Sequence, residues 1–85
     1  MTIHLFSTAN RQTLNELNAM IDEMDTLLLI GDGCYLASQI KHSNSFALEQ
    51  DMAIRNQASH VIELITDSQW VELVASSNQV ISWLD

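Results

Sequence analysis

The chain has 85 residues, 47% of them hydrophobic, which suits one small domain over residues 1–85 and excludes a disordered acidic tail. Eleven acidic residues outnumber three basic ones for a formal net charge of −8, which excludes direct binding of nucleic acid and attraction to an anionic membrane surface. Only Cys34 carries a thiol, and the sequence shows neither a signal peptide nor an apolar run of membrane-spanning length, so we expect a cytoplasmic protein.

Three regular elements are predicted in the first third of the chain. Residues 2–6 are β-branched and apolar, which predicts a strand. Apolar residues at spacings of three, four and seven predict a helix over about residues 10–24. A continuous apolar run predicts a strand over 26–31 that is covered on both faces, as in a parallel sheet. The apolar stripe of the helix consists of Leu14, Leu17, Met20, Ile21 and Met24.

A turn, a short helix and a loop are predicted next. Glycines on both sides of Asp32 tolerate the tight turn that closes the second strand. Residues 34–40 are expected to form a short helix, and the polar residues 41–45 a loop. The two glycines lack the third glycine of a dinucleotide loop and the Gly-Lys of a phosphate loop, so we expect no nucleotide cofactor.

Strands and helices alternate through the rest of the chain. Further strands are predicted over 46–48, 60–65 and 79–83, with helices between them. The connections are too short for anything but local crossovers. The alternation therefore predicts an α/β fold, namely a single small domain with a mostly parallel sheet flanked by helices.

Side-chain pairs support the two later helices. Asp51 and Arg55 are spaced i, i+4 after an acidic helix start, which favours an ion pair on a helix of about two turns. Thr66 and Gln69 match a capping box, and an apolar helix side that includes Trp70 follows.

Cys34 is the candidate catalytic residue. It follows Gly33 at the end of a buried strand, where open α/β sheets place ligands, and a helix N-terminus nearby would favour a thiolate able to carry a persulfide. Free cysteine is also among the most buried residue types. Because no basic residue lies within six positions and Asp32 is close, we favour the structural interpretation.

The histidines predict no metal site. His4, His42 and His60 share no ligand spacing, so we expect solvated or singly hydrogen-bonded side chains. The chain has no Gly-x-Ser-x-Gly nucleophile motif, and its acidic residues form no evident acid–base pair.

The two tryptophans are the candidates for a protein interface, where this residue type is enriched among hot spots. Trp70 lies on the inner stripe of its helix, which favours a position in the core. Trp83 lies in the last predicted strand, and a strand there would be at a sheet edge or against a partner. We therefore predict an interface role for Trp83 first and for Trp70 second.

Four segments resemble the TusB/DsrH family. Residues 27–37 resemble its Leu-rich strand followed by Asp-Gly, variable residues and Ala. Residues 46–56 resemble its aromatic-Ala-Leu-x-x-Asp run that ends in Arg-Gly, with Asn56 in place of the glycine. Residues 70–73 and 80–83 resemble its closing aromatic-Val-x-Leu helix and Val-x-x-Trp tail. In order and spacing the resemblance spans nearly the whole chain.

The resemblance implies a non-catalytic subunit of a DsrEFH/TusBCD-type sulfur-relay complex. In that family a homologous partner of the same fold carries sulfur as a cysteine persulfide, which passes toward 2-thiouridine at the tRNA wobble position. A related complex serves dissimilatory sulfur oxidation, and some of its members carry a cysteine in the first helix. Since residues 10–24 contain none, the tRNA pathway is the closer analogy. The implied partners are TusC/TusD-like or DsrE/DsrF-like subunits.

Other functions remain open at this point. The alternatives are a thiol sulfurtransferase that uses Cys34, a subunit of the dissimilatory relay, or an unrelated α/β interaction module. A chain this short buries only about 60% of its unfolded surface, so we expect it to work with partners rather than as a lone monomer. In isolation, a homodimer through the same surface is the expected substitute.

Overall fold

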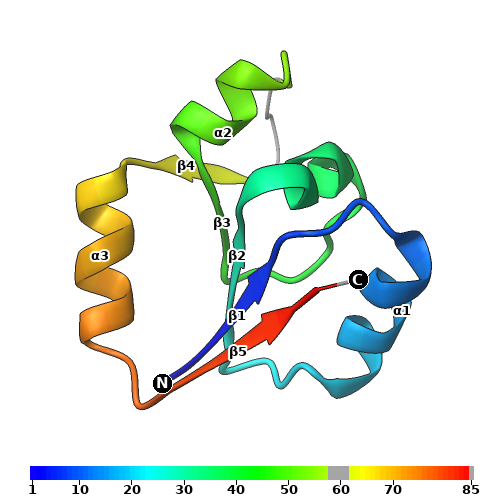
Figure 1. Ribbon diagram of the computed structural model, residues 1–85. Coiled ribbons are helices and arrows are strands. Elements are labelled where there is room, and N and C mark those ends of the chain that lie inside the picture. Colours follow the sequence, from blue (N-terminus) through cyan, green and yellow to red (C-terminus); the bar gives the residue numbers. More distant parts are fainter. Residues whose placement is uncertain (58–61, 85) are drawn as a thin grey trace.

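A five-stranded parallel sheet forms the centre of the structure, a computed structural model that describes residues 1–57 and 62–84 (Figure 1). The spatial order of the strands is β4-β3-β2-β1-β5, and each neighbouring pair is parallel. The prediction of a mostly parallel α/β fold is therefore confirmed. The elements are β1 (Thr2–Phe6), α1 (Arg11–Met20), β2 (Thr26–Leu29), the 3-10 helix η1 (Gly31–Gln39), β3 (Ser45–Leu48), α2 (Glu49–Ile54), β4 (Glu63–Ile65), α3 (Asp67–Ala75) and β5 (Gln79–Trp83).

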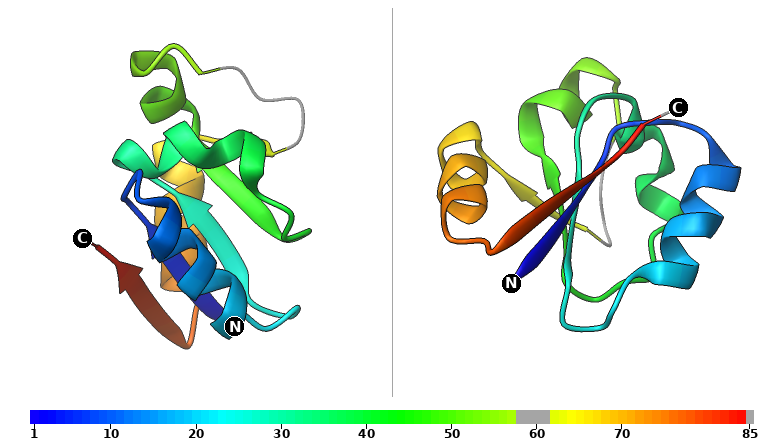
Figure 2. Two further views of the ribbon diagram at one scale, coloured as in Figure 1. Left: turned by 90° about the vertical axis from the view of Figure 1, so that its right-hand side faces the viewer. Right: turned by 60° about the horizontal axis from the view of Figure 1, so that its bottom comes forward.

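The helices divide between the two faces of the sheet (Figure 2). One face packs against α1 and η1, with Met52 of α2 in the same buried cluster; we call this the α1 face. Among the helices of residues 1–57 and 62–84, only α3 packs against the opposite face, which we call the α3 face. Side chains alternate along each strand, so Phe6 points to the α1 face and Leu5 to the α3 face.

β1 lies inside the sheet, between β2 and β5. Phe6 is in register with Leu29 of β2 on one side and with Trp83 of β5 on the other. β5 therefore forms one edge of the sheet and β4 the other, which agrees with the edge position expected for the last strand. Since all strands are parallel, their carboxyl ends lie together along one side of the sheet, which we call the carboxyl edge. The helices η1 and α2 begin there.

Both side-chain caps that favour the longer helices are present. The Asn10 side chain accepts hydrogen bonds from the backbone N–H groups of Gln12 and Thr13 at the start of α1. The capping box predicted from Thr66 and Gln69 is confirmed at the start of α3, with both of its reciprocal hydrogen bonds formed.

The predicted helix over residues 10–24 is wrong at its end. α1 stops at Met20, Ile21 is already extended, and the Met20 and Met24 side chains are 69% and 77% exposed. The reason is local: the Asp22 carboxylate accepts a hydrogen bond from the Met24 N–H, and the Asp25 carboxylate accepts one from the Asp22 N–H. Such side-chain bonds offer the backbone a turn that competes with another helical turn.

Smaller differences concern the bounds of other elements. β2 ends at Leu29 rather than at residue 31, because the 3-10 helix η1 begins at Gly31 instead of the short helix predicted over 34–40. β4 covers Glu63–Ile65 of the strand predicted over 60–65, whose first two residues lie outside the described residues. No helix in the described part of the chain has the length and apolarity to cross a bilayer.

Candidate functional site

Cys34 lies in η1, just beyond the carboxyl end of β2, and its side chain is fully buried. Its thiol donates a hydrogen bond to the Leu29 carbonyl oxygen over 3.9 Å. Burial raises the pKa of the thiol to about 11; the Asp51 and Asp32 carboxylates add to this rise, and the Arg55 charge partly opposes it. At neutral pH the side chain is therefore a protonated thiol without access to solvent.

Gly33 permits this burial because η1 approaches the end of β1 very closely. A Cβ at this position would lie 2.1 Å from the Phe6 carbonyl oxygen, a backbone atom that cannot move aside. Gly31 serves a different purpose, since its φ of +51° is a left-handed conformation that glycine adopts without strain. The Gly-Asp-Gly pattern thus allows one tight turn and one close backbone contact.

Arg55 closes the carboxyl edge of the sheet over η1. Its Nε and Nη2 atoms donate to one Asp32 oxygen at 3.2 and 3.1 Å, which raises the pKa of Arg55, and its guanidinium lies 5.8 Å from the centre of the Tyr35 ring. The predicted Asp51–Arg55 ion pair is wrong. The Asp51 carboxylate instead accepts a hydrogen bond from the Gly31 N–H at 2.7 Å, and Arg55 reaches only the Asp51 backbone oxygen.

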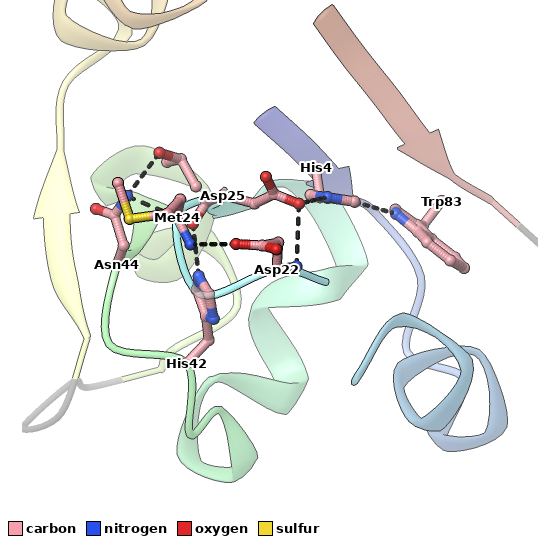
Figure 3. A network of polar contacts seen from close by, with 8 residues as sticks. His4, Asp22, Met24, Asp25, His42, Asn44 and Trp83 are labelled. Carbon is pink, nitrogen blue, oxygen red and sulfur yellow. Dashed lines mark hydrogen bonds and ion pairs between the residues drawn. The ribbon is translucent and has the colours of Figure 1, made fainter. Parts of the chain in front are cut away.

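A second polar cluster, shown in Figure 3, is centred on Asp25, and its member on the α1 face of β1 is His4. His4 is 2% exposed and makes two hydrogen bonds, one with the Asp25 carboxylate at 2.9 Å and one with the Trp83 indole N–H at 3.0 Å. Because the indole N–H donates to His4 Nδ1, the proton of the neutral ring is on Nε2, which donates to Asp25. The bond from His4 is the main reason that the pKa of Asp25 is lowered.

The expectation of solvated or singly bonded histidines is therefore wrong for His4. It holds for His42, whose Nε2 donates to the Asp25 backbone oxygen at 2.6 Å, while His60 lies outside the described residues. Within residues 1–57 and 62–84, no group of three His, Cys, Asp or Glu side chains is arranged to hold a metal ion. Nothing local in the sequence indicates the two bonds of His4, because its partners are 21 and 79 positions away.

The two tryptophans lie on opposite faces of the sheet, both half-buried. Trp83 packs against the cluster of the α1 face and has its indole N–H bound by His4. Trp70 packs against the cluster of the α3 face, and its buried indole N–H has no hydrogen-bond partner among the described residues. Both interface assignments stay predictions.

An apolar hollow of about 300 Å³ lies beside Trp70 on the surface of α3. The sequence contains a signal for it: Val71 stands next to the inner stripe of the helix and widens the apolar arc beyond what one sheet face can cover. A second hollow, of about 320 Å³, lies at the carboxyl edge between the starts of α2 and α3 and contains no thiol or imidazole. Its lining residues are Glu49, Gln50, Ala53, Thr66 and Asp67.

One comparison with known proteins identifies a family, and another finds a similar fold. A family model described as DsrH like protein matches residues 6–80. The solution NMR structure of protein Tm0979 from Thermotoga maritima is similar in fold, with a TM-score of 0.64 and 20% sequence identity over 91% of this chain and 94% of that chain. A search of curated proteins found no match.

Proposed function

This chain belongs to the DsrH-like family, and we propose that it is a non-catalytic subunit of a sulfur-relay complex that passes persulfide sulfur toward 2-thiouridine at the tRNA wobble position. Its task is to hold homologous subunits together while one of them carries the sulfur. The working location in this proposal is the cytoplasm, and the net charge of −8 favours contact with protein partners over direct contact with tRNA.

The state of Cys34 is the observation that carries the proposal. A persulfide carrier needs a thiolate that a donor can reach, and thiolates form where a thiol is partly exposed beside positive charge. Cys34 is fully buried with a pKa near 11, so about one thiol in ten thousand is ionised at pH 7. As the sequence holds no other cysteine, sulfur has no carrier on this chain.

A scaffolding role is also supported by the surface of the described residues. Large apolar side chains are exposed on several elements, among them Tyr35 at 47% and Val71 at 60%. A protein that works by packing against other subunits leaves such side chains uncovered until it assembles.

The test follows labelled sulfur through the assembled complex. The chain is purified with its homologous subunits, incubated with a labelled persulfide donor, and mapped by mass spectrometry. We expect the label on a partner's cysteine, and we expect Cys34→Ser to support wobble-uridine thiolation within about twofold of the parent complex. Cys34→Ala serves as a second variant, because it removes the thiol and any hydroxyl that could replace it.

Two outcomes would overturn the proposal. Stoichiometric label on Cys34, with transfer lost in a Cys34→Ser complex that still assembles, would establish a thiol sulfurtransferase. A complex that assembles and accepts sulfur but leaves tRNA unmodified would favour the dissimilatory relay instead.

A further inference from the structure

The apolar side of α3 extends beyond the part of the helix that packs against the sheet. Trp70, Leu73 and Val74 pack against the α3 face but are only half-buried, and no residue of the helix is fully buried. Val71 is 60% exposed beside them. The hollow on this surface is lined by Trp70, Val71, Val74 and Ala75, so it offers apolar contacts and no hydrogen-bonding side chain except the indole.

The Trp70 side chain is only partly packed by its own chain. Its buried N–H has no acceptor among the described residues, which weakens the hold of the α3 face on the ring. Tryptophan side chains that form the wall of a hollow are the usual anchors of protein interfaces. The part of the Trp70 ring that lines the hollow is therefore placed to gain apolar contacts from a partner.

The charges around this surface are of one sign. The segment from Ile62 to Leu84 contains no Lys or Arg, and its acidic side chains, Glu63, Asp67 and Glu72, are all exposed. Asp67 lies one helical turn before Val71 on the same side of α3. Glu63 is in register with Phe46, whose side chain packs on the α3 face, so Glu63 points to that side too.

We call the side chains of Glu63, Asp67 and Glu72 the acidic rim. Its negative charge favours some binding partners for the hollow over others. A second copy of the chain would bring an identical acidic rim against it, and like charges in an interface oppose association. An anionic bilayer is repelled for the same reason. A different protein with an apolar side chain for the hollow and Lys or Arg around it is complementary in both shape and charge.

We propose that the α3 face is the docking surface for a homologous relay subunit whose contact region carries a large apolar side chain within a basic rim. The apolar side chain fills the hollow against Trp70 and Val71, and the basic rim pairs with Asp67, Glu72 and Glu63. This proposal rests on the proposed function for the identity of the partner. The position and the charge of the surface come from the residues of α3 and β4.

The experiment measures binding of the full-length chain to each purified homologous subunit by titration calorimetry and sedimentation. Val71→Glu adds one charge to the hollow and should weaken binding by at least about 30-fold, the range of hot-spot residues. Ile54→Glu is the matched control, because Ile54 is a similar aliphatic side chain on α2, 70% exposed, and gains the same charge. Its binding should stay within about threefold of the parent.

Salt provides a second readout. Raising the salt concentration should weaken the parent complex, because opposite charges across the rim are screened. The double variant Asp67→Asn, Glu72→Gln should show a smaller salt dependence. Circular dichroism confirms that each variant is folded before it is compared.

Each remaining outcome overturns the inference in a distinguishable way. If a subunit binds the parent and Val71→Glu equally well, the α3 face is not the docking surface, and the proposed function stands. If the parent binds no homologous subunit, the proposed function fails as well. If the parent sediments as a homodimer that Val71→Glu dissociates, the occupant is a second copy and the charge argument is wrong.

Discussion

The two faces of the sheet differ in how many of their side chains are buried. Among the described residues, the buried cluster of the α1 face has twelve members and that of the α3 face has four, with six half-buried side chains around them. Each face contains one tryptophan, and only Trp83 on the α1 face has its indole N–H bound. The α1 face is thus a largely buried core, whereas most of the apolar side chains on the α3 face are only half-buried.

The difference follows from what the chain provides to each face. Two helical segments and Met52 cover the α1 face, and the Gly33 contact brings η1 down onto β1. A single nine-residue helix covers the α3 face. If this comparison is correct, substitutions on the α1 face should lower the free energy of unfolding, whereas those on the α3 face should chiefly affect assembly.

Gly33→Ala should have the largest effect on stability. The new methyl group would lie 2.1 Å from the Phe6 carbonyl oxygen, so β1 and η1 must separate, and we expect a loss above about 4 kcal/mol, which single substitutions reach only exceptionally. Urea unfolding followed by circular dichroism measures it.

Gly31→Ala is the control for that substitution. Its Cβ would meet only an Arg55 nitrogen at 4.0 Å, so the cost should be limited to the left-handed backbone, about 1–2 kcal/mol. Equal losses in the two variants would show that close packing of η1 is not what holds this edge of the α1 face.

Leu17→Ala and Leu73→Ala compare the two faces directly. Leu17 is fully buried on the α1 face, so its truncation should cost about 3 kcal/mol. Leu73 is half-buried on the α3 face and should cost about 1 kcal/mol in the isolated chain, because its surroundings are partly open already. The comparison of the faces breaks if chemical denaturation gives Leu73→Ala the larger loss.

The two tryptophans also compare the faces, because the indole N–H is hydrogen-bonded on one face and has no acceptor among the described residues on the other. Trp83→Phe removes a donor and leaves His4 Nδ1 without its bond, whereas Trp70→Phe removes a donor that has no acceptor. After the similar loss of ring area, Trp83→Phe should be less stable by about 1–2 kcal/mol than Trp70→Phe. Thermal unfolding of the two variants side by side measures the difference, and a reversed order would contradict it.

Asp25→Asn should have the smallest effect and should depend on pH. The folded pKa of Asp25 lies below its ordinary value of 3.8, so the carboxylate stabilises the fold above that pH, and this contribution is lost as the pH falls through the folded pKa. We expect the variant to be about 1 kcal/mol less stable than the parent at pH 7. The gap should close as the pH falls from 3.8 through the folded pKa.

Glu23→Gln is the control for the pH measurement, because Glu23 is exposed and only two positions from Asp25. As an exposed substitution outside the His4–Asp25 bond, it should stay within about 0.5 kcal/mol of the parent at pH 7 in urea unfolding curves. A gap between Asp25→Asn and the parent that stays constant down to pH 2 would argue against the His4–Asp25 bond as its source.

Local patterns in the sequence predicted the strands better than the contacts between them. The bounds of β1 and β5 agree with the predicted 2–6 and 79–83, because runs of apolar and β-branched residues are a property of a few neighbours. Asn56, which stands where the family has glycine, takes a left-handed conformation with a φ of 53°, and asparagine tolerates that region.

The predictions of side-chain partners failed where residues distant in the sequence form the hydrogen bond or ion pair instead of a near neighbour. Asp51 was available to Arg55 in sequence, but the fold brings the Gly31 N–H to Asp51 and brings Asp32 to Arg55. The positive neighbour of Cys34 was missed for the same reason, since Arg55 approaches it only through the packing of α2 on η1. His4 looks like an ordinary strand residue until β5 brings Trp83 beside it.

The pairing of β5 with β1 has a consequence for the synthesis of the chain. β1 emerges from the ribosome first of the five strands and β5 last. About fifty residues separate the end of β2 from the start of β5, which takes roughly 3–10 s at 5–20 residues per second. Throughout that interval the backbone of β1 has one unpaired side, and an unpaired strand edge is a template for pairing with other chains. We therefore expect the β1 edge of a nascent chain to need protection from other chains until β5 has been made.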